Sequence, residues 1–270
     1  MTKIKRAALA DLQNSIDTRG KRIERVGVER VKLPISISRK RPDGIPTTIM
    51  AYASMYVSIN PEIKGANMSR FLECLMSYES VVITSEHLKV MVEDMLKRLE
   101  SKDGYIEIRF NYFVPRKAPV SEVRGVQGYE VAFIGREING KYDFVTEVNV
   151  MGTTLCPCSK EISAYGAHNQ RCRIRARLVP NKELYWIEDI IETIEGCVSC
   201  PIFPVLKRED EKWVTEHAYD NPKFVEDLVR DLAIALDNKG IEYYNLKCTA
   251  EESIHHHEAV AYLRKDWILE

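Results

Sequence analysis

The order of strand-like and helix-like segments constrains the fold of this chain more than any other feature. In the first half, two strand-like segments, two helical segments and two more strand-like segments follow one another, at residues 28–38, 47–59, 69–78, 85–99, 105–114 and 125–134. The second half repeats this order, at residues 143–151, 172–179, 187–194, 224–236, 241–249 and 259–263. Because strands are grouped with strands and helices with helices, we predict an α+β fold with helices packed on one face of antiparallel sheets.

Local periodicity and residues typical of helix starts and ends support these assignments. Residues 28–38 are rich in valine and isoleucine and alternate in polarity, which is typical of a strand with one buried face. Apolar residues recur with a period near 3.6 over residues 85–99, with Ser85 as the expected N-cap, which indicates an amphipathic helix. Pro222 favours the start of the last helix and Gly240 favours its end.

The composition is that of a globular chain with a large core. The 270 residues are 45% hydrophobic, which suffices for one large domain or two small ones. We expect an N-terminal arm over residues 1–27, a first unit over 28–138, and a second unit over 139–270 that contains the cysteine and histidine motifs described below. The 39 Lys and Arg residues balance the 40 Asp and Glu residues, so a nucleic-acid partner is not expected and affinity for a phosphorylated ligand must be local.

The cysteines and the apolar runs indicate the cellular compartment in which the protein is expected. No apolar run approaches the roughly 20 residues needed to span a bilayer, and the first residues are too polar for the apolar region of a signal peptide. The seven cysteines are odd in number and scattered along the chain. We therefore predict reduced thiols in a cytoplasmic protein that does not bind membranes.

A loop with cysteines and a histidine lies between two predicted strands. It contains Cys156, Cys158 and His168, which are ligands that suit a divalent transition metal. Only one residue separates the two thiols, which is too few for both to bind one zinc ion in the usual way, so we expect one to be a ligand and the other to pack. The remaining donors must come from elsewhere, and the candidates are the acidic run 209–211 and the cluster 251–258.

The second cluster contains three consecutive histidines. If they lie on a strand, His255 and His257 share one face and His256 takes the other. Two imidazoles on one face, with Glu252 just upstream, supply neutral bases near physiological pH and a carboxylate to orient them. The pattern predicts a metal-dependent catalyst with a proton-transfer site.

Three blocks of the sequence resemble the GTP cyclohydrolase IB family, the prokaryotic second type of GTP cyclohydrolase I. The first block is Leu-Cys-Pro-Cys-Ser-Lys-Glu-Ile-Ser with Tyr-Gly-Ala-His-Asn-Gln-Arg, at residues 155–163 and 165–171. The second block is residues 206–227, and the third is residues 252–259, where the family more often has asparagine at the position of His256. The resemblance covers most of the chain, and its first block is highly specific.

The resemblance implies a tunnelling fold (T-fold) of two tandem strand-strand-helix-helix-strand-strand units. It also implies a homotetramer with active sites at subunit interfaces. The family reaction converts GTP and water to 7,8-dihydroneopterin triphosphate and formate, the first step of tetrahydrofolate and pterin biosynthesis. One divalent transition metal per active site is implied, and a mixed thiolate, imidazole and carboxylate set suits Mn²⁺, Fe²⁺ or Zn²⁺.

Motif by motif, the resemblance assigns Cys156, His168 and Glu211 to the metal. It assigns Glu226 to the guanine edge of the substrate, and Glu216 is the rival for either carboxylate role. If neighbouring chains share the site, Cys156 and Glu226 are expected on opposite sides of the interface.

Catalysis and phosphate binding involve further residues of these blocks. The expected catalytic residues are Cys156, Glu252, His255 and His257. The triphosphate needs cations, and those in or beside the blocks are Lys160, Arg171, Lys207 and Arg208.

Two other functions stay open. A nitrile reductase of the queuosine pathway shares the tunnelling fold but uses a cysteine nucleophile and a nicotinamide without metal, so metal analysis distinguishes it. Alternatively, the chain is a binding module with a structural zinc site, because Cys197 and Cys200 have ligand spacing and can combine with Cys156 and Cys158.

Overall fold

The computed structural model describes residues 13, 15–40, 44–180 and 185–266. In this part of the chain, ten strands form one sheet in the order β10-β9-β7-β6-β5-β4-β2-β1-β3, with β8 paired to β6. The strands are β1 (Ile23–Ile37), β2 (Thr47–Ile59), β3 (Val82–Ile83), β4 (Gly104–Lys117), β5 (Arg124–Ile138), β6 (Lys141–Leu155), β7 (Asn169–Val179), β8 (Cys200–Pro201), β9 (Tyr243–Ala250) and β10 (Ala259–Lys265). The pairings are antiparallel except for that of β3 with β1.

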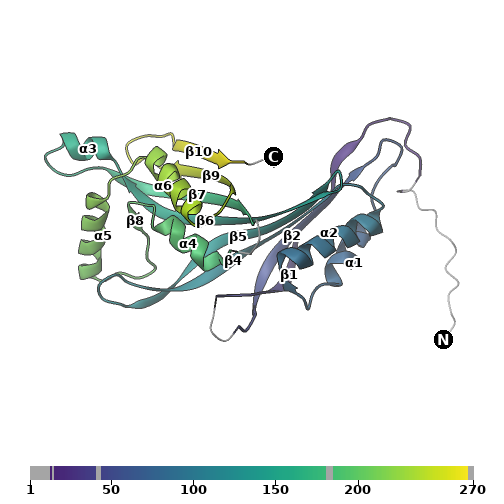
Figure 1. The fold of residues 1–270 in the computed structure, drawn as a ribbon, viewed down its shortest axis with the longest axis horizontal. Coiled ribbons are helices and arrows are strands. Elements are labelled where there is room, and N and C mark those ends of the chain that lie inside the picture. Colours follow the sequence, from purple (N-terminus) through teal and green to yellow (C-terminus); the bar gives the residue numbers. More distant parts are fainter. Residues whose placement is uncertain (1–12, 14, 41–43, 181–184, 267–270) are drawn as a thin grey trace.

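The helices of the described chain lie along one face of this sheet. They are α1 (Met68–Met76), α2 (Ser85–Leu99), α3 (Pro157–Ile162), α4 (Ile187–Glu195), α5 (Arg208–Asp220) and α6 (Val225–Asn238). The pair α1 and α2 covers one half of the sheet, and α4 and α6 cover the other half (Figure 1). The predicted α+β class, with helices on one face of an antiparallel sheet, is confirmed. No described helix is long and apolar enough to cross a membrane.

The core lies between the helices and the sheet. Side chains alternate between the two faces of a strand, so every second residue of β2, β4 and β7 faces the helices. Met55, Ile108 and Ile174 do so and are fully buried, as are Leu88 of α2 and Leu232 of α6. Burying one such side chain stabilises the fold by roughly 1.5–3 kcal/mol relative to leaving it exposed.

The element boundaries differ from the predictions at several points. Strand β1 begins at Ile23, so the end of the predicted arm 1–27 belongs to the sheet. Residues 1–12 and 14 of that arm lie outside the described residues. Helices α3 and α5 were not predicted, because α3 buries no side chain and α5 buries only two, so neither has an apolar stripe to detect.

The cap of α2 also differs from the prediction. Thr84 rather than Ser85 is the N-cap residue, and its Oγ1 accepts a hydrogen bond from the backbone N–H of His87 at 3.2 Å. A β-region residue with a hydroxyl acceptor is the preferred N-cap, and here it comes one position earlier than expected.

Helix α5 is anchored by the middle residue of the acidic run 209–211. Asp210 is fully buried and accepts hydrogen bonds from the backbone N–H groups of Val120, Ser121 and Lys207, at 2.8, 2.9 and 2.8 Å. The Ser121 hydroxyl donates another. Burial alone raises the pKa of Asp210, but these hydrogen bonds outweigh burial and hold the pKa well below its usual range. Asp210 therefore ties α5 to the β4–β5 connection as an anion.

We expect Asp210→Ala to lower the melting temperature at pH 7 by several degrees, because it leaves backbone donors without an acceptor. A carboxyl group with a depressed pKa in the folded protein stabilises the fold at pH values above its unfolded-state pKa of about 3.9. This contribution disappears as the pH falls through the lower pKa of the folded state. The difference from the parent protein should therefore shrink in acid. Thermal melts of Asp210→Ala and of the exposed control Glu209→Ala, from pH 7 to pH 3, test this. An Asp210→Ala protein as stable as the control would contradict it.

Candidate active site

The register of β6 with β7 brings the two central motif residues together. Thr154 pairs with Gln170, and two residues further along each chain segment the backbone N–H of Cys156 donates to the carbonyl of His168 at 3.1 Å. Within each pair the two residues lie opposite one another. The two pairs are two residues apart along the chain, so their side chains point to the same face of the sheet. This geometry places the Cys156 thiol and the His168 imidazole side by side.

A cavity of about 440 Å³ opens next to this pair. Three parts of the chain enclose it. They are the end of β6 together with the start of β7, the start of α6, and the β9–β10 connection. Its lining residues are Thr154, Cys156, His168, Gln170, Lys223, Phe224, Val225, Glu226, Glu252, Ile254, His255, His257, Ala259 and Val260. Six of the residues singled out from the sequence line it together: Cys156, His168, Glu226, Glu252, His255 and His257.

The imidazole of His168 is held by a hydrogen-bonded chain. Its Nδ1 lies 3.0 Å from Oε1 of Gln170, whose Nε2 donates to Thr154 Oγ1 at 2.9 Å. The carboxylate of Glu252 is also near, with Oε2 3.7 Å from His168 Nδ1. At that distance Glu252 contributes charge rather than a hydrogen bond.

The donor set at this end of the cavity fits a transition metal. Cys156 is half-buried and caps α3, where its Sγ accepts from the Ser159 N–H at 3.4 Å, and negative charge is favoured at a helix N-terminus. With the imidazole of His168 and the carboxylate of Glu252, the cavity offers sulfur, nitrogen and oxygen donors. Within the described part of one chain, however, no group of three His, Cys, Asp or Glu side chains is arranged to hold a metal ion.

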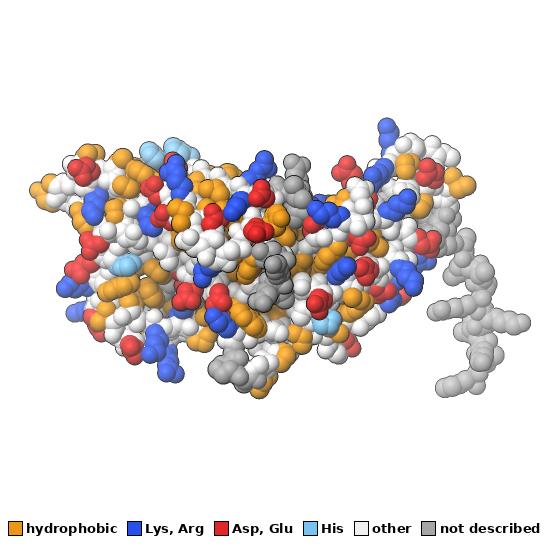
Figure 2. All heavy atoms as spheres, viewed as in Figure 1, with side chains coloured by type: hydrophobic (Ala, Val, Ile, Leu, Met, Phe, Trp, Pro, Cys, Tyr) orange, Lys and Arg blue, Asp and Glu red, His pale blue; other side chains and the backbone are white. Residues whose placement is uncertain are grey.

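The three histidines lie in the β9–β10 connection rather than on a strand. The backbone turns there, and the N–H of His255 donates to the carbonyl of Glu252 at 3.2 Å. The rings of His255 and His257 stack with centroids 4.7 Å apart and planes 14° apart, and both line the cavity, whereas His256 does not. The predicted separation of His256 from its neighbours therefore holds, but a turn produces it. Histidine side chains gather on the surface near the start of β10 in Figure 2.

The predicted phosphate-binding cations lie outside the cavity lining. Arg171 is exposed and alternates with the buried Gln170, so it lies on the opposite face of the sheet. The ammonium of Lys160 lies 4.2 Å from the ring centroid of Tyr219 and donates to the Tyr219 carbonyl, which ties α3 to α5. Lys207, which is the N-cap of α5, and the neighbouring Arg208 are exposed.

Glu211 and Glu216 are likewise outside the lining. Both are exposed on α5, and Glu216 lies 3.8 Å from the ammonium of Lys212. The described structure thus brings together two of the three predicted metal ligands, Cys156 and His168, but not the third, Glu211.

Sequence reasoning missed three polar residues of the cavity, Thr154, Gln170 and Lys223. Gln170 follows His168 by two positions on a strand, so alternation from the histidine could have found it. Lys223 is the single Lys or Arg among the described lining residues, and its Nζ donates to Asp231 at 2.5 Å. Lys223 lies between Pro222 and the start of α6, a position that gave no periodic signal.

The side chains of the second cysteine pair, Cys197 and Cys200, are packed in the protein interior rather than arranged to bind zinc. Burial raises the pKa of Cys197 and of Cys200 to about 11 each, so both are thiols at neutral pH. Cys197 Sγ donates to the Thr193 carbonyl at 3.2 Å, and Cys200 is fully buried beside Leu155. Packing accounts for both residues.

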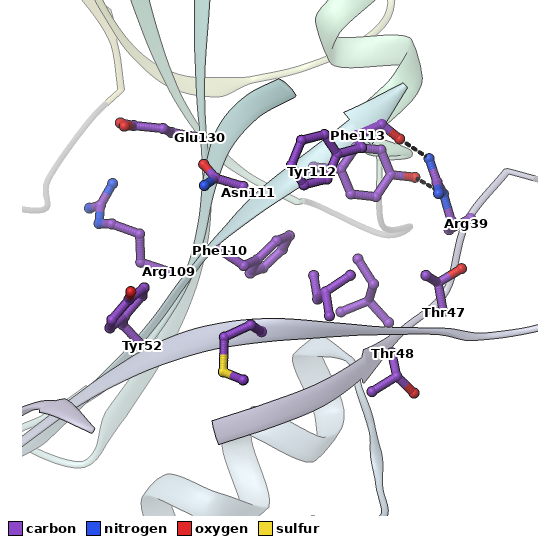
Figure 3. Close-up of a pocket in the computed structure, with 13 residues that line it drawn as sticks. Arg39, Thr47, Thr48, Tyr52, Arg109, Phe110, Asn111, Tyr112, Phe113 and Glu130 are labelled. Atoms are coloured by element: carbon purple, nitrogen blue, oxygen red, sulfur yellow. Dashed lines mark hydrogen bonds between the residues drawn. The ribbon is translucent and has the colours of Figure 1, made fainter. Parts of the chain in front are cut away.

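A larger cavity of about 670 Å³ lies in the other half of the sheet, where β2 stops pairing with β4. Its lining includes Arg39, Tyr52, Arg109 and Glu130, and Arg39 donates to the Tyr112 hydroxyl at 3.0 Å (Figure 3). No cysteine or histidine lines it. The donor set therefore identifies the cavity beside Cys156 and His168 as the candidate active site, although the cavity of Figure 3 and another of about 750 Å³ near Asp103 are both larger.

Comparisons with known proteins identify the family of the chain. The family described as "Type I GTP cyclohydrolase folE2" matches residues 9–261. The "GTP cyclohydrolase FolE2" of Azoarcus sp. (strain BH72) is 45% identical over 262 residues, 96% of each chain. That of Thiobacillus denitrificans (strain ATCC 25259 / T1) is 44% identical over 259 residues, 96% of this chain and 95% of the relative.

Among solved structures, the chain resembles uricases in fold alone. The uricase of Arthrobacter globiformis has a TM-score of 0.55 at 7% identity, covering 90% of this chain and 94% of that one. The uricase of Bacillus fastidious has a TM-score of 0.50 at 8% identity, with the same coverage. The sequence matches extend over nearly the whole chain and contain every residue of the cavity, and so the chain belongs to the type I GTP cyclohydrolase folE2 family.

Proposed function

We propose that this chain is a metal-dependent GTP cyclohydrolase that converts GTP and water to 7,8-dihydroneopterin triphosphate and formate, the first step of tetrahydrofolate and pterin biosynthesis. The observation that carries the proposal is the convergence of Cys156, His168, Glu226, His255 and His257 on one cavity in a member of this family. The family match favours the cyclohydrolase over a nitrile reductase, and the packing of the second cysteine pair disfavours a structural-zinc module.

The six cavity residues singled out from the sequence have roles in the proposed reaction. The carboxylate of Glu226, in the first turn of α6, accepts hydrogen bonds from the N–H groups of the guanine edge. Cys156 and His168 would hold Mn²⁺, Fe²⁺ or Zn²⁺, which when bound would supply a water molecule with a pKa lowered towards neutrality. His255 and His257 carry protons to and from the imidazole ring and the ribose oxygens, with Glu252 beside them.

The direct test is an anaerobic assay of purified protein with GTP, with Mn²⁺, Fe²⁺ or Zn²⁺ added to separate samples. Formate release and pterin fluorescence should rise together and depend on metal. Protein that retains metal but releases no formate from GTP would reject the proposed function.

We propose Glu211 as the carboxylate ligand and Glu252 as an acid–base residue, and the two roles predict different losses. Glu211→Gln should lose metal and turnover together, because an amide is a weaker ligand than a carboxylate for these ions. Glu252→Gln should keep its metal and lose turnover. Metal content by mass spectrometry, measured beside turnover, tests both. Metal loss in Glu252→Gln with retention in Glu211→Gln would exchange the assignments, since Glu252 is the carboxylate nearest His168.

We further propose two tandem tunnelling-fold units, over 28–138 and 139–270, assembled as a homotetramer in the cytoplasm. The seven free thiols suit a reducing compartment. The cavity bears one described cation, Lys223, already paired with Asp231, so the triphosphate needs cations from a neighbouring chain.

A hybrid-tetramer experiment tests the shared site. Arg171 faces away from its own cavity, so we expect it to serve a neighbouring one. Hybrids of Cys156→Ala with Arg171→Ala should then regain part of the activity that each parent lacks, because some sites combine an intact cavity with an intact Arg171.

The matched control is the pair Cys156→Ala with Glu226→Ala. The expectation that these two residues lie on opposite sides of an interface is wrong for the described chain, because one cavity of one chain contains both. That pair should therefore regain no activity. No regain in the Arg171 hybrids, despite subunit exchange verified by mass spectrometry, would remove Arg171 from the neighbouring site.

A further inference from the structure

Gln170 is a buried polar residue with two partners and no role in the reaction described above. Its side chain lies beneath the cavity on β7, and only 7% of the residue is exposed. Its amide bridges His168, which immediately precedes β7, and Thr154, its cross-strand partner on β6. Thr154 is 1% exposed, so solvent does not compete for this chain of hydrogen bonds.

The direction of the hydrogen bonds from His168 through Gln170 to Thr154 determines which nitrogen of His168 bears the proton. Because Gln170 donates from Nε2 to the Thr154 hydroxyl, the atom that faces His168 Nδ1 at 3.0 Å is the carbonyl oxygen Oε1. A carbonyl oxygen only accepts, so Nδ1 must carry the hydrogen. In the neutral ring, Nε2 then keeps its lone pair.

No other described contact to His168 Nδ1 competes for this role. The carboxylate of Glu252 is 3.7 Å from the same nitrogen, which is beyond hydrogen-bonding distance. Neutral histidine side chains in water favour the opposite tautomer, with the proton on Nε2. A histidine that must present Nε2 to a metal therefore gains from a partner that holds the proton on Nδ1.

We propose that Gln170 is a positioning residue that holds His168 in the Nδ1–H tautomer, so that Nε2 is available as a metal ligand, and that Thr154 orients Gln170 for this purpose. The inference rests on the proposed metal site, but it concerns the metal-free protein as well. Loss of such a hydrogen-bonding partner typically costs roughly 10–100-fold in metal affinity.

The test measures the tautomer and the metal affinity separately. The full-length, metal-free protein, labelled with ¹⁵N-histidine, gives the protonated nitrogen of each ring, and the signal missing from His168→Ala identifies His168. We expect the proton on Nδ1 in the parent protein and a shift towards Nε2 in Gln170→Met, which has similar length but no acceptor. Competition with a chromophoric chelator should show Zn²⁺ binding about 10–100-fold weaker in Gln170→Met.

Two further variants separate this role from a structural one. Gln170→Glu keeps an acceptor oxygen and should retain Zn²⁺ affinity within a few-fold, which a loss of packing alone would not predict. Gln127→Met, a matched change on β5 outside the cavity, should alter neither measurement. If Gln170→Met unfolds, Thr154→Val provides the test, because it removes the group that orients the amide while it preserves shape.

The outcomes also separate this inference from the proposed reaction. A parent His168 protonated on Nε2, or unchanged Zn²⁺ affinity in a folded Gln170→Met, overturns the positioning role. A parent protein that shows the expected tautomer and affinities but does not turn over GTP leaves the positioning role in place and rejects the cyclohydrolase instead.

Discussion

Cys156→Ala and His168→Ala should each reduce GTP turnover to background and abolish metal retention, while the fold and the assembly stay intact. Each removes one of the two proposed metal ligands, whose positions the β6–β7 register brings together, and in the proposed reaction the bound metal would supply the nucleophile. Neither Cys156 nor His168 belongs to the large core cluster, so the loss should be chemical rather than structural. Turnover, metal content and melting temperature, measured on the same preparations, check this.

Cys158→Ala is the matched control for the thiol. Cys158 is exposed on α3 and does not line the cavity, so its variant should keep its metal and nearly full activity. An inactive Cys158→Ala beside an active Cys156→Ala would mean that the wrong thiol has been assigned. Full activity in both Cys156→Ala and His168→Ala would reject the metal site.

His255→Ala and His257→Ala should each lower kcat by roughly 10²–10⁴-fold with little change in KM, because they remove proton transfer and not binding. Their rings stack, so each orients the other, and the double variant should lose less than the product of the single losses. Steady-state kinetics of the two single variants and the double variant test this.

His256→Asn is the control within the same turn. His256 is exposed and outside the cavity lining, so this change should be nearly silent. A severe loss of kcat in His256→Asn would show that the side of the turn facing the substrate has been assigned wrongly.

The sequence alone determined the fold class and the local part of the site. The period-2 and period-3.6 patterns predicted the sheet and four of its helices, because burial against one face forces those periods on strands and helices. Cys156 and His168 are twelve residues apart across one antiparallel connection, so a local motif was enough to bring them together.

Only the tertiary structure decided how the distant segments meet. Pairing of β9 with β7 carries the β9–β10 connection, with His255 and His257, to the start of β7, and the packing of α6 brings Glu226 to the same cavity. Helix α5 could not be predicted, because its one buried charged residue, Asp210, is held by donors from the distant β4–β5 connection. Hydrophobic periodicity reports which face of an element is buried but not which element covers it. Strand order and long-range hydrogen bonds supply that information, and they exist only in the folded chain.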